Sequence, residues 1–366
     1  MNKSDKIYVA GHLGLVGSAL VRSLQRKGYS NILGRPIHEL NLLDQRETLE
    51  FFKTEKPDYV ILAAAKVGGI IANNTYRAQF IYENLQIQNN IIHSSYLTGV
   101  KKLLFLGSSC IYPKNAPQPL KEDYLLSSDL EYTNEPYAIA KIAGIKMIES
   151  YNIQYGTNYI SVMPTNLYGI NDNYDLEKSH VLPALIRKMH LAKCLEDKNW
   201  DSIQKDFAKR PTNNIHLNST REGILNELSK YGISHSESGK VILSLWGSGT
   251  PRREFLFSDD MADACVFLME NTDFKDVVSD TTKSGEVKNT HINIGTGKDV
   301  TIKELAAIIK SITGFKGEIK WDISKPDGTK QKLLDVQKIN SLGWKEKISL
   351  EQGIAMVYNQ YKIDLN

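Results

Sequence analysis

The chain has 366 residues, of which 41% are apolar and 24% charged. This is an ordinary globular composition, and the chain is long enough for two lobes or one large α/β unit. Its formal net charge of +3 comes from 45 basic and 42 acidic residues spread along the chain, so we expect no nucleic-acid or membrane partner, while a small anionic ligand is compatible with it. Three cysteines without a pairing pattern predict a reducing compartment, and the N-terminal stretch lacks an apolar run long enough for a signal peptide. We therefore expect a cytoplasmic protein.

The first half of the chain alternates short apolar runs with helical patterns. Such runs are typical of strands that are buried on both faces of a parallel sheet. Their alternation with helices predicts βαβ units with right-handed crossovers, and hence an α/β fold with a doubly wound parallel sheet. The predicted strands are KIYVAG, SNIL, DYVILAA, KLLFLGS and YISVMPT, and the helices between them include SALVRSLQRKG and EPYAIAKIAGIKMIESYNIQYG.

A glycine-rich turn, VAGHLGLVGSAL, follows the first predicted strand and opens the first helix. Gly11, Gly14 and Gly17 allow the backbone to approach a pyrophosphate, and the helix dipole favours an anion at that end. A glycine pattern alone is a weak signal, and a tight structural turn is the alternative. Because this one lies between a strand and a helix, it predicts a dinucleotide cofactor.

The end of the second predicted strand reads ILGRPIHEL. Sites that are specific for NAD usually place an acidic residue there, which binds the ribose 2′-hydroxyl. Arg35 stands there instead, and arginine suits a 2′-phosphate, although an exposed loop arginine is the alternative. The pattern favours NADP(H).

The catalytic prediction depends on residues that follow the fourth predicted strand. FLGSSCIYP places Ser108, Ser109 and Cys110 at the carboxyl end of that strand, where doubly wound sheets bind ligands. Tyr137 and Lys141 lie four residues apart on the next long helix and share one face. The Tyr-x-x-x-Lys spacing alone is common, but together with the serine and the glycine turn it predicts a hydride-transfer site.

Each member of this set has a chemical role in the predicted site. Tyr137 would protonate the oxygen of a reduced ketone, and Ser108 would orient that oxygen. The Lys141 ammonium and the positive charge of the nicotinamide would together lower the pKa of Tyr137, and Lys141 would hold the nicotinamide ribose.

The second half of the chain is less regular. VILSLWG and HINIG predict strands, and TIKELAAIIKSITG predicts a helix that starts at Thr301. Residues 193–240 are rich in polar side chains, yet we expect two surface helices there and no disorder. The first is predicted by the helical spacing of Trp200, Ile203 and Phe207, and the second by a capping box from Ser219 to Glu222 and a stop at Gly232.

Longer stretches resemble the extended short-chain dehydrogenase/reductase family. They cover nearly the whole chain except residues 193–240 and a patch near 274–289. The resemblance implies a Rossmann domain over residues 1–168, to which 252–275 returns, and a smaller α/β substrate domain over 169–366. The stretches are LAAAKVGGIIANNTY, LLFLGSSCIYPK, TNEPYAIAKIAGIK, SVMPTNLYG, SHVLPAL, WGSGTPRREF, NIGTG, SKPDGT and KLLDV.

The resemblance also implies roles for individual residues. It implies a catalytic set of Ser108, Tyr137 and Lys141, with Cys110 and His180 as base and acid of an epimerisation, and no metal. Its NADP(H) contacts would be Gly11, Gly14, Leu15, Val16, Gly17, Arg35, Ala63, Ala64, Ala65, Lys141, Pro164, Asn166, Leu167 and His180. Its substrate contacts would be Ser109, Asn166, Lys188, Trp246, Arg253 and Lys332. The chain departs from the family at Leu13 and Ile37, where members carry arginines that bind the 2′-phosphate.

The function implied by the resemblance is reduction, by NADPH, of the C4 keto group of a GDP-4-keto-6-deoxy-mannose or GDP-4-keto-heptose. This step belongs to nucleotide-sugar biosynthesis for surface polysaccharide such as capsule, and the family implies a homodimer. Epimerisation at C3 and C5 would precede reduction, or a separate epimerase would perform it. We expect residues 193–240 to contribute to the sugar end of the pocket and not to cofactor binding.

Two other functions are weighed against this one. A 4,6-dehydratase would carry an Asp-Glu pair directly after the hydroxyl residue, where this chain has Ser109 and Cys110. A non-catalytic NADP-binding regulator would be expected to lose Tyr137 or Lys141, and both are present.

Overall fold

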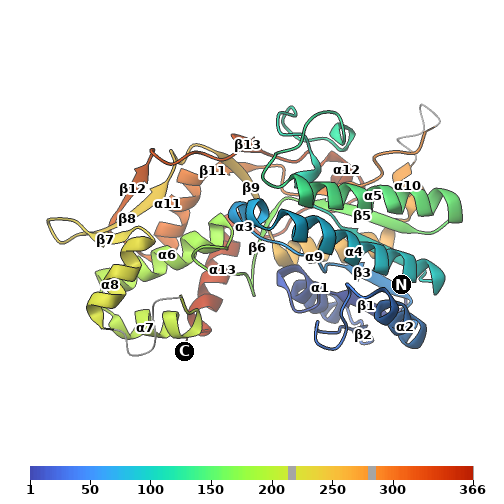
Figure 1. Ribbon diagram of the computed structural model, residues 1–366, viewed down its shortest axis with the longest axis horizontal. Helices are drawn as coiled ribbons and strands as arrows, with labels where there is room; N and C mark the ends of the chain where they lie inside the picture. Colours follow the sequence, from blue (N-terminus) through green and yellow to red (C-terminus); the bar gives the residue numbers. More distant parts are fainter. Residues whose placement is uncertain (213–219, 279–285, 366) are drawn as a thin grey trace. The chain divides into compact units, whose positions relative to one another are not determined.

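A computed structural model describes residues 1–212, 220–278 and 286–365 (Figure 1). The chain forms two compact units. Unit 1 comprises Met1–Leu167, Glu254–Lys298 and Lys332–Lys347, and unit 2 comprises Tyr168–Arg253, Asp299–Gln331 and Ile348–Asn366. The chain passes between them within β6 (Asn166–Tyr168), β9 (Arg252–Phe257) and β13 (Gln331–Lys332), and at two further points.

Within the described residues, unit 1 is built on a six-stranded parallel sheet in the order β10-β5-β4-β3-β1-β2. All six strands fall in segments that the sequence predicts as strands. Because β1 has β2 on one side and β3 on the other, the winding reverses at β1 and β3, and ligands bind at the carboxyl ends of such strands. The strands are β1 (Ile7–Ala10), β2 (Ile32–Leu33), β3 (Tyr59–Leu62), β4 (Lys102–Leu106), β5 (Tyr159–Pro164) and β10 (Ile292–Ile294).

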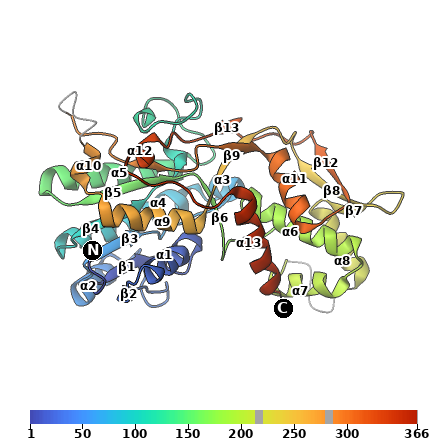
Figure 2. The same ribbon diagram turned by 180° about the vertical axis from the view of Figure 1, so that it is seen from behind.

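Helices cover both faces of this sheet, which confirms the doubly wound prediction. One core joins Ile7 of β1 to Leu20 of α1 (Leu15–Arg26) and Met261 of α9 (Ser258–Asn271), and Figure 2 shows these two helices on the same side of the sheet. The next residue of β1, Tyr8, belongs to a second core with α2 (Gln45–Glu55), α4 (Arg77–Leu97) and α5 (Glu135–Tyr155). Shorter helices are α3 (Ile70–Thr75), α10 (Phe274–Val278) and α12 (Gln337–Ser341).

Unit 2 contains a smaller sheet in the order β12-β8-β7. In it β7 (Ile233–His235) is antiparallel and β12 (Glu318–Asp322) is parallel to β8 (Val241–Trp246). As predicted, α11 begins directly after Thr301, whose side chain and that of Glu304 form a capping box. The other elements are β11 (Asp299–Thr301), α6 (Val181–Glu196), α7 (Trp200–Lys209), α8 (Arg221–Lys230), α11 (Ile302–Thr313) and α13 (Leu350–Ile363).

Residues 193–240 contain the two predicted helices, α7 and α8, but not the predicted capping box. Ser219 lies outside the described residues, and Thr220 is the N-cap of α8, accepting a hydrogen bond from the backbone N of Gly223 at 3.1 Å. The helix therefore begins one residue later than the box required, with glycine and not glutamate three residues after the cap. The segment is also integrated into unit 2, because its apolar residues Ile203, Phe207, Ile224 and Leu228 are buried and β7 pairs with β8.

None of the helices in the described ranges has both the length and the apolar character needed to cross a membrane.

Candidate active site

The glycine turn after β1 forms a cradle for an anion. A Cβ at Gly11 would lie 2.8 Å from the backbone N of Ala64, and one at Gly17 would lie 2.0 Å from the carbonyl O of Gly11. The N-cap of α1 is Gly14, which has no side chain to cap the first-turn N–H groups of this helix. These N–H groups are therefore available to bind an anion. The cradle fits the pyrophosphate of a dinucleotide and adjoins the predicted cofactor residues Ala63 and Ala64 at the winding reversal.

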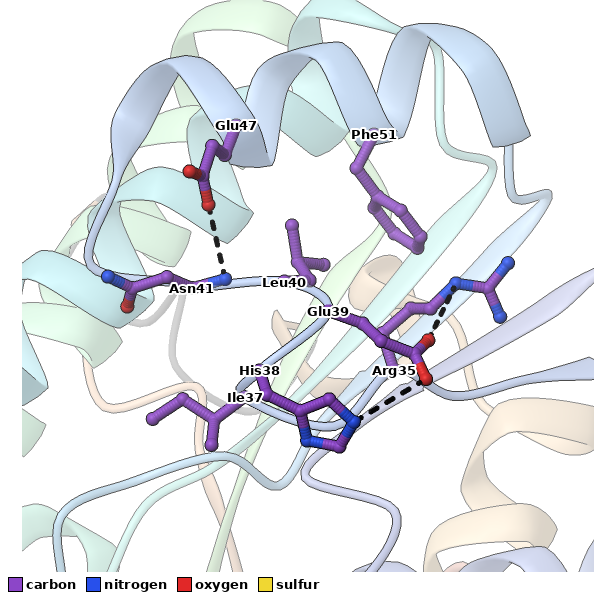
Figure 3. A pocket seen from close by; sticks show the side chains of 8 residues that line it. All are labelled: Arg35, Ile37, His38, Glu39, Leu40, Asn41, Glu47 and Phe51. Carbon is purple, nitrogen blue, oxygen red and sulfur yellow. Dashed lines mark hydrogen bonds and ion pairs between the residues drawn. The ribbon is translucent and has the colours of Figure 1, made fainter.

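Arg35 stands just beyond β2, beside a shallow depression that Figure 3 shows. Its Nη2 donates to Oε1 of Glu55 at 3.0 Å, and its Nε lies 3.8 Å from Oε2 of Glu39. Leu13 and Ile37, where family members carry arginines, are both exposed. A 2′-phosphate at this strand end would therefore compete with Glu55 for the guanidinium.

Ser108, Tyr137 and Lys141 come together at the carboxyl end of β4. The Ser108 side chain interacts with the Tyr137 hydroxyl and acts to lower the pKa of that hydroxyl. Lys141 Nζ donates to the carbonyl O of Leu106 at 2.9 Å and lies 5.7 Å from the centroid of the Tyr137 ring. The helix carrying Tyr137 and Lys141, α5, can approach β4 this closely because Gly144 lacks a side chain: a Cβ there would lie 2.5 Å from the Phe105 ring.

Burial sets the electrostatics of this trio. It lowers the pKa of Lys141 from 10.5 to about 7. It also raises the pKa of Tyr137 above its ordinary value, with Cys110 adding to the rise and the hydrogen bond to Ser108 opposing it. Desolvation is the largest of these influences on the pKa of Tyr137. The lowering expected from Lys141 together with the positive charge of the nicotinamide stays a prediction. Tyr137 remains protonated at neutral pH, as a proton donor must.

Cys110 lies in a 3₁₀ turn, Ser109–Ile111, and its backbone N donates to Oγ of Ser108 at 3.3 Å. Its Sγ accepts from Nζ of Lys332 at 3.4 Å and from Nδ2 of Asn134 at 3.5 Å. The other two cysteines, Cys194 and Cys265, are buried, whereas Cys110 is partly exposed. The structure thus joins the predicted base to the predicted substrate lysine, and adds an asparagine that the sequence analysis missed.

A second missed residue is Glu254, a fully buried carboxylate on β9. It accepts hydrogen bonds from the backbone N of Thr296 at 2.6 Å, of Gly297 at 2.8 Å and of Leu334 at 2.9 Å. Its own carbonyl O accepts from Nδ2 of Asn166 at 2.8 Å. The sequence carried one signal for Glu254: in the stretch REFLF it directly precedes three apolar residues.

Four more predicted side chains lie in unit 2. His180 is the exposed N-cap of α6, and Lys188 on that helix is half-buried, which lowers its pKa. Arg253 Nη1 donates to the carbonyl O of Thr329 at 2.6 Å, and burial lowers the pKa of this arginine. Trp246, at the end of β8, is exposed. The roles of these residues stay predictions.

Comparison with known proteins places this geometry in a family. Residues 7–207 and 209–295 match the NAD dependent epimerase/dehydratase family. The chain belongs to this family. The match begins at β1 and ends just past β10, so it spans the whole parallel sheet with the glycine cradle, Ser108, Tyr137 and Lys141. Lys332 lies beyond the family match.

Individual proteins are similar over almost the full length. A putative GDP-L-fucose synthase 2 of Arabidopsis thaliana is 51% identical over 99% of this chain and 93% of its own. A solved GDP-6-OMe-4-keto-L-xylo-heptose reductase from Campylobacter jejuni is 50% identical, with a TM-score of 0.90 over 99% of both chains. A GDP-mannoheptose C4 reductase from Campylobacter jejuni, solved with NADP bound, is 49% identical, with a TM-score of 0.85 over 99% of both chains. The family resemblance inferred from the motifs is confirmed.

Proposed function

We propose that the protein reduces the C4 keto group of a GDP-4-keto-6-deoxy-mannose or GDP-4-keto-heptose with NADPH, in nucleotide-sugar biosynthesis for surface polysaccharide. The observation that carries the proposal is the meeting of Ser108, Tyr137 and Lys141 at the end of β4, in the unit that holds the glycine cradle. The names of relatives about half identical to this chain supply the sugar-nucleotide class. A cytoplasmic location agrees with three unpaired cysteines.

In this reaction the bound cofactor supplies a hydride to C4. Tyr137 donates its hydroxyl proton to the C4 oxygen, and the Ser108 hydroxyl orients that oxygen. Lys141, positioned by the carbonyl O of Leu106, binds the nicotinamide ribose. Lys188 and Arg253 bind the diphosphate as cations, and Trp246 offers an apolar face.

The test of the proposal is NADPH oxidation with each GDP-4-keto sugar, followed by product analysis. We expect oxidation with at least one of them and a product reduced at C4. Absence of oxidation with both would contradict the proposal. Conversion of GDP-mannose to a 4-keto product without net cofactor use would instead support a dehydratase.

We propose further that Cys110 and His180 act as base and acid in epimerisation before reduction. The protons on C3 and C5 are acidified by the neighbouring C4 ketone, and inversion needs a base and an acid. Incubating the GDP-4-keto sugar with oxidised cofactor in deuterated water should place deuterium at C3 or C5. The incorporation should be lost in Cys110→Ser. Exchange no greater than without enzyme, while reduction remains intact, would leave a C4 reductase served by a separate epimerase.

The cofactor preference gives a prediction of its own. NADPH should bind more tightly than NADH, and Arg35→Ala should narrow the difference, because Arg35 is the basic residue at the end of β2. Dissociation constants from fluorescence titration measure this. Arg46→Ala, on the neighbouring α2, is the control and should leave the difference unchanged. Equal affinities in the unmodified protein would contradict the preference.

We also propose that the protein is a homodimer that pairs through α4 and α5. Tyr96, Tyr151 and Tyr155 form an aromatic cluster where these helices meet, with Tyr96 and Tyr155 stacked at 4.3 Å between centroids, and Leu97 beside them is exposed. Sedimentation velocity should show a dimer that Leu97→Glu weakens. Ile363→Glu, an equally apolar exposed position on α13, should leave the dimer intact. A monomer at micromolar concentration would contradict the proposal.

A further inference from the structure

The buried carboxylate of Glu254 ties together segments that are distant in sequence. It accepts backbone hydrogen bonds from Thr296 and Gly297, which follow β10, and from Leu334, which follows β13. A Cβ at Gly295 would lie 2.2 Å from its Oε1, so the turn after β10 wraps closely around it. A carboxylate that accepts this many N–H groups fixes the backbone that donates them.

The Leu334 contact bears on the site because Lys332 stands two residues earlier. On one side of this segment, Leu120 N donates to the Leu333 carbonyl O at 2.7 Å, and Asp335 N donates to the Leu120 carbonyl O at 2.9 Å. The Leu334 N–H points to the other side, as alternate residues of an extended chain do, and meets Oε2 of Glu254 at 2.9 Å. The two sides together set the path of the backbone that carries Lys332.

We propose that Glu254 is a positioning residue of the Cys110 site, which holds the backbone around Leu334 so that the Lys332 ammonium reaches the Cys110 sulfur. The 3.4 Å contact between Lys332 Nζ and Cys110 Sγ is the point at which this positioning acts. The catalytic meaning rests on the proposed function, in which Cys110 is the base of an epimerisation.

The chemistry of such a base explains why the ammonium matters. In proton abstraction, the C–H bond next to the ketone breaks, an S–H bond forms, and the electron pair moves into an enolate with its charge on the C4 oxygen. The sulfur must begin as a thiolate, and the Lys332 ammonium, which donates to it at 3.4 Å, is the cation beside that negative charge.

The test uses Glu254→Gln, which keeps the shape of the side chain. Its one oxygen can still accept from Thr296 and Gly297, but its NH₂ group would face the Leu334 N–H, donor against donor. The measurement is the rate of iodoacetamide alkylation of Cys110 across pH 6–9, followed by mass spectrometry of its peptide. Cys194 and Cys265 are buried, and burial raises the pKa of Cys194 to about 12, so neither competes. We expect the alkylation rate at pH 7 to fall by about tenfold, because the Lys332 ammonium no longer reaches the sulfur that reacts.

Four further variants separate positioning from general damage. Lys332→Met should reproduce the slow alkylation, and adding Glu254→Gln to it should cause no further fall, because the glutamate acts through the lysine. Glu149→Gln is the matched control: Glu149 is a buried carboxylate that accepts from Thr290 N at 3.0 Å, before β10, and its loss should leave alkylation unchanged. Glu254→Asp keeps the negative charge on a shorter side chain. Its alkylation rate should lie between those of the unmodified protein and Glu254→Gln.

The proposal is overturned if Glu254→Gln is alkylated at the normal rate, if Glu149→Gln slows equally, or if the double variant is slower than Lys332→Met alone. Circular dichroism checks that each variant is folded. Should Glu254→Gln not fold, Glu254→Asp decides: slowed alkylation supports the proposal and a normal rate overturns it. Alkylation needs no substrate, so failure of NADPH oxidation would count against the proposed function and leave this result standing.

Discussion

Tyr137→Phe should lower the turnover number for keto reduction by about 100-fold to 10,000-fold, the range expected for loss of one general acid. In the proposed reaction the hydroxyl of Tyr137 gives its proton to the C4 oxygen, and phenylalanine removes that hydroxyl alone. The ring would stay in place, because it packs edge-on against Phe80 with centroids 6.4 Å apart. The glycine cradle between β1 and α1 does not include this hydroxyl, so we expect the dissociation constant for NADPH to stay unchanged.

The measurement is single-turnover oxidation of NADPH together with a binding titration. Tyr132→Phe is the control, because it removes a tyrosine hydroxyl outside the trio and keeps the ring. The centroid of that ring lies 4.3 Å from Cζ of Arg77. Turnover near normal in Tyr137→Phe would remove the tyrosine from its role. Loss of NADPH binding in parallel would show that the substitution disturbs the fold.

The parallel sheet could be predicted because its strands are buried on both faces and therefore read as unbroken apolar runs. All five residues of β4 are buried, Lys102 among them. The ammonium of this lysine donates to the carbonyl O atoms of Leu268 and Met269 at 2.9 and 3.0 Å, at the end of α9. The run KLLFLGS thus showed the strand, but it could not show what its lysine binds 166 residues away.

The candidate site was predictable where the chemistry is local and not where it depends on distant contacts. Tyr137 and Lys141 share a helix face by their spacing, and Ser108 follows a strand. The contact of Lys332 with Cys110 joins residues 222 positions apart. Glu254 on β9 contacts the segments that follow β10 and β13. No local sequence pattern reports either contact. The rise in the pKa of Tyr137 could not be predicted for a related reason: it depends on burial, which spacing alone does not give.

Residues 193–240 show how polar composition can hide a buried ion pair. Asp206 of α7 is fully buried, and its carboxylate accepts from Nε of Arg187 at 2.9 Å and from the Tyr361 hydroxyl. Nη2 of Arg187 lies 2.8 Å from Oδ1 of the same carboxylate. The helical spacing predicted α7 as a surface helix, but it gave no sign that one of its aspartates is buried.

Asp206→Asn should lower the free energy of unfolding by about 3–5 kcal/mol, because it leaves the buried guanidinium of Arg187 without its counter-charge. Urea denaturation of the cofactor-free protein measures this. The matched control is Asp201→Asn on the same helix: Asp201 is 74% exposed and pairs with Lys205 at 2.9 Å, so its loss should cost less than about 1 kcal/mol. Replacing both partners with apolar residues, as in Arg187→Met with Asp206→Leu, should recover most of the stability.

If Asp206→Asn lowers the free energy of unfolding no more than Asp201→Asn does, the buried ion pair contributes little to stability. The expected result also bears on how the role of residues 193–240 can be tested. Deleting the whole segment removes Asp206 along with the apolar residues Ile203 and Phe207, and strands Arg187 in the core of unit 2. Such a truncation would destabilise unit 2, so a change in its kinetics could not be attributed to sugar binding. Substitutions at exposed positions of α7 and α8 are therefore the variants whose Michaelis constants can test whether the segment contributes to the sugar end of the pocket.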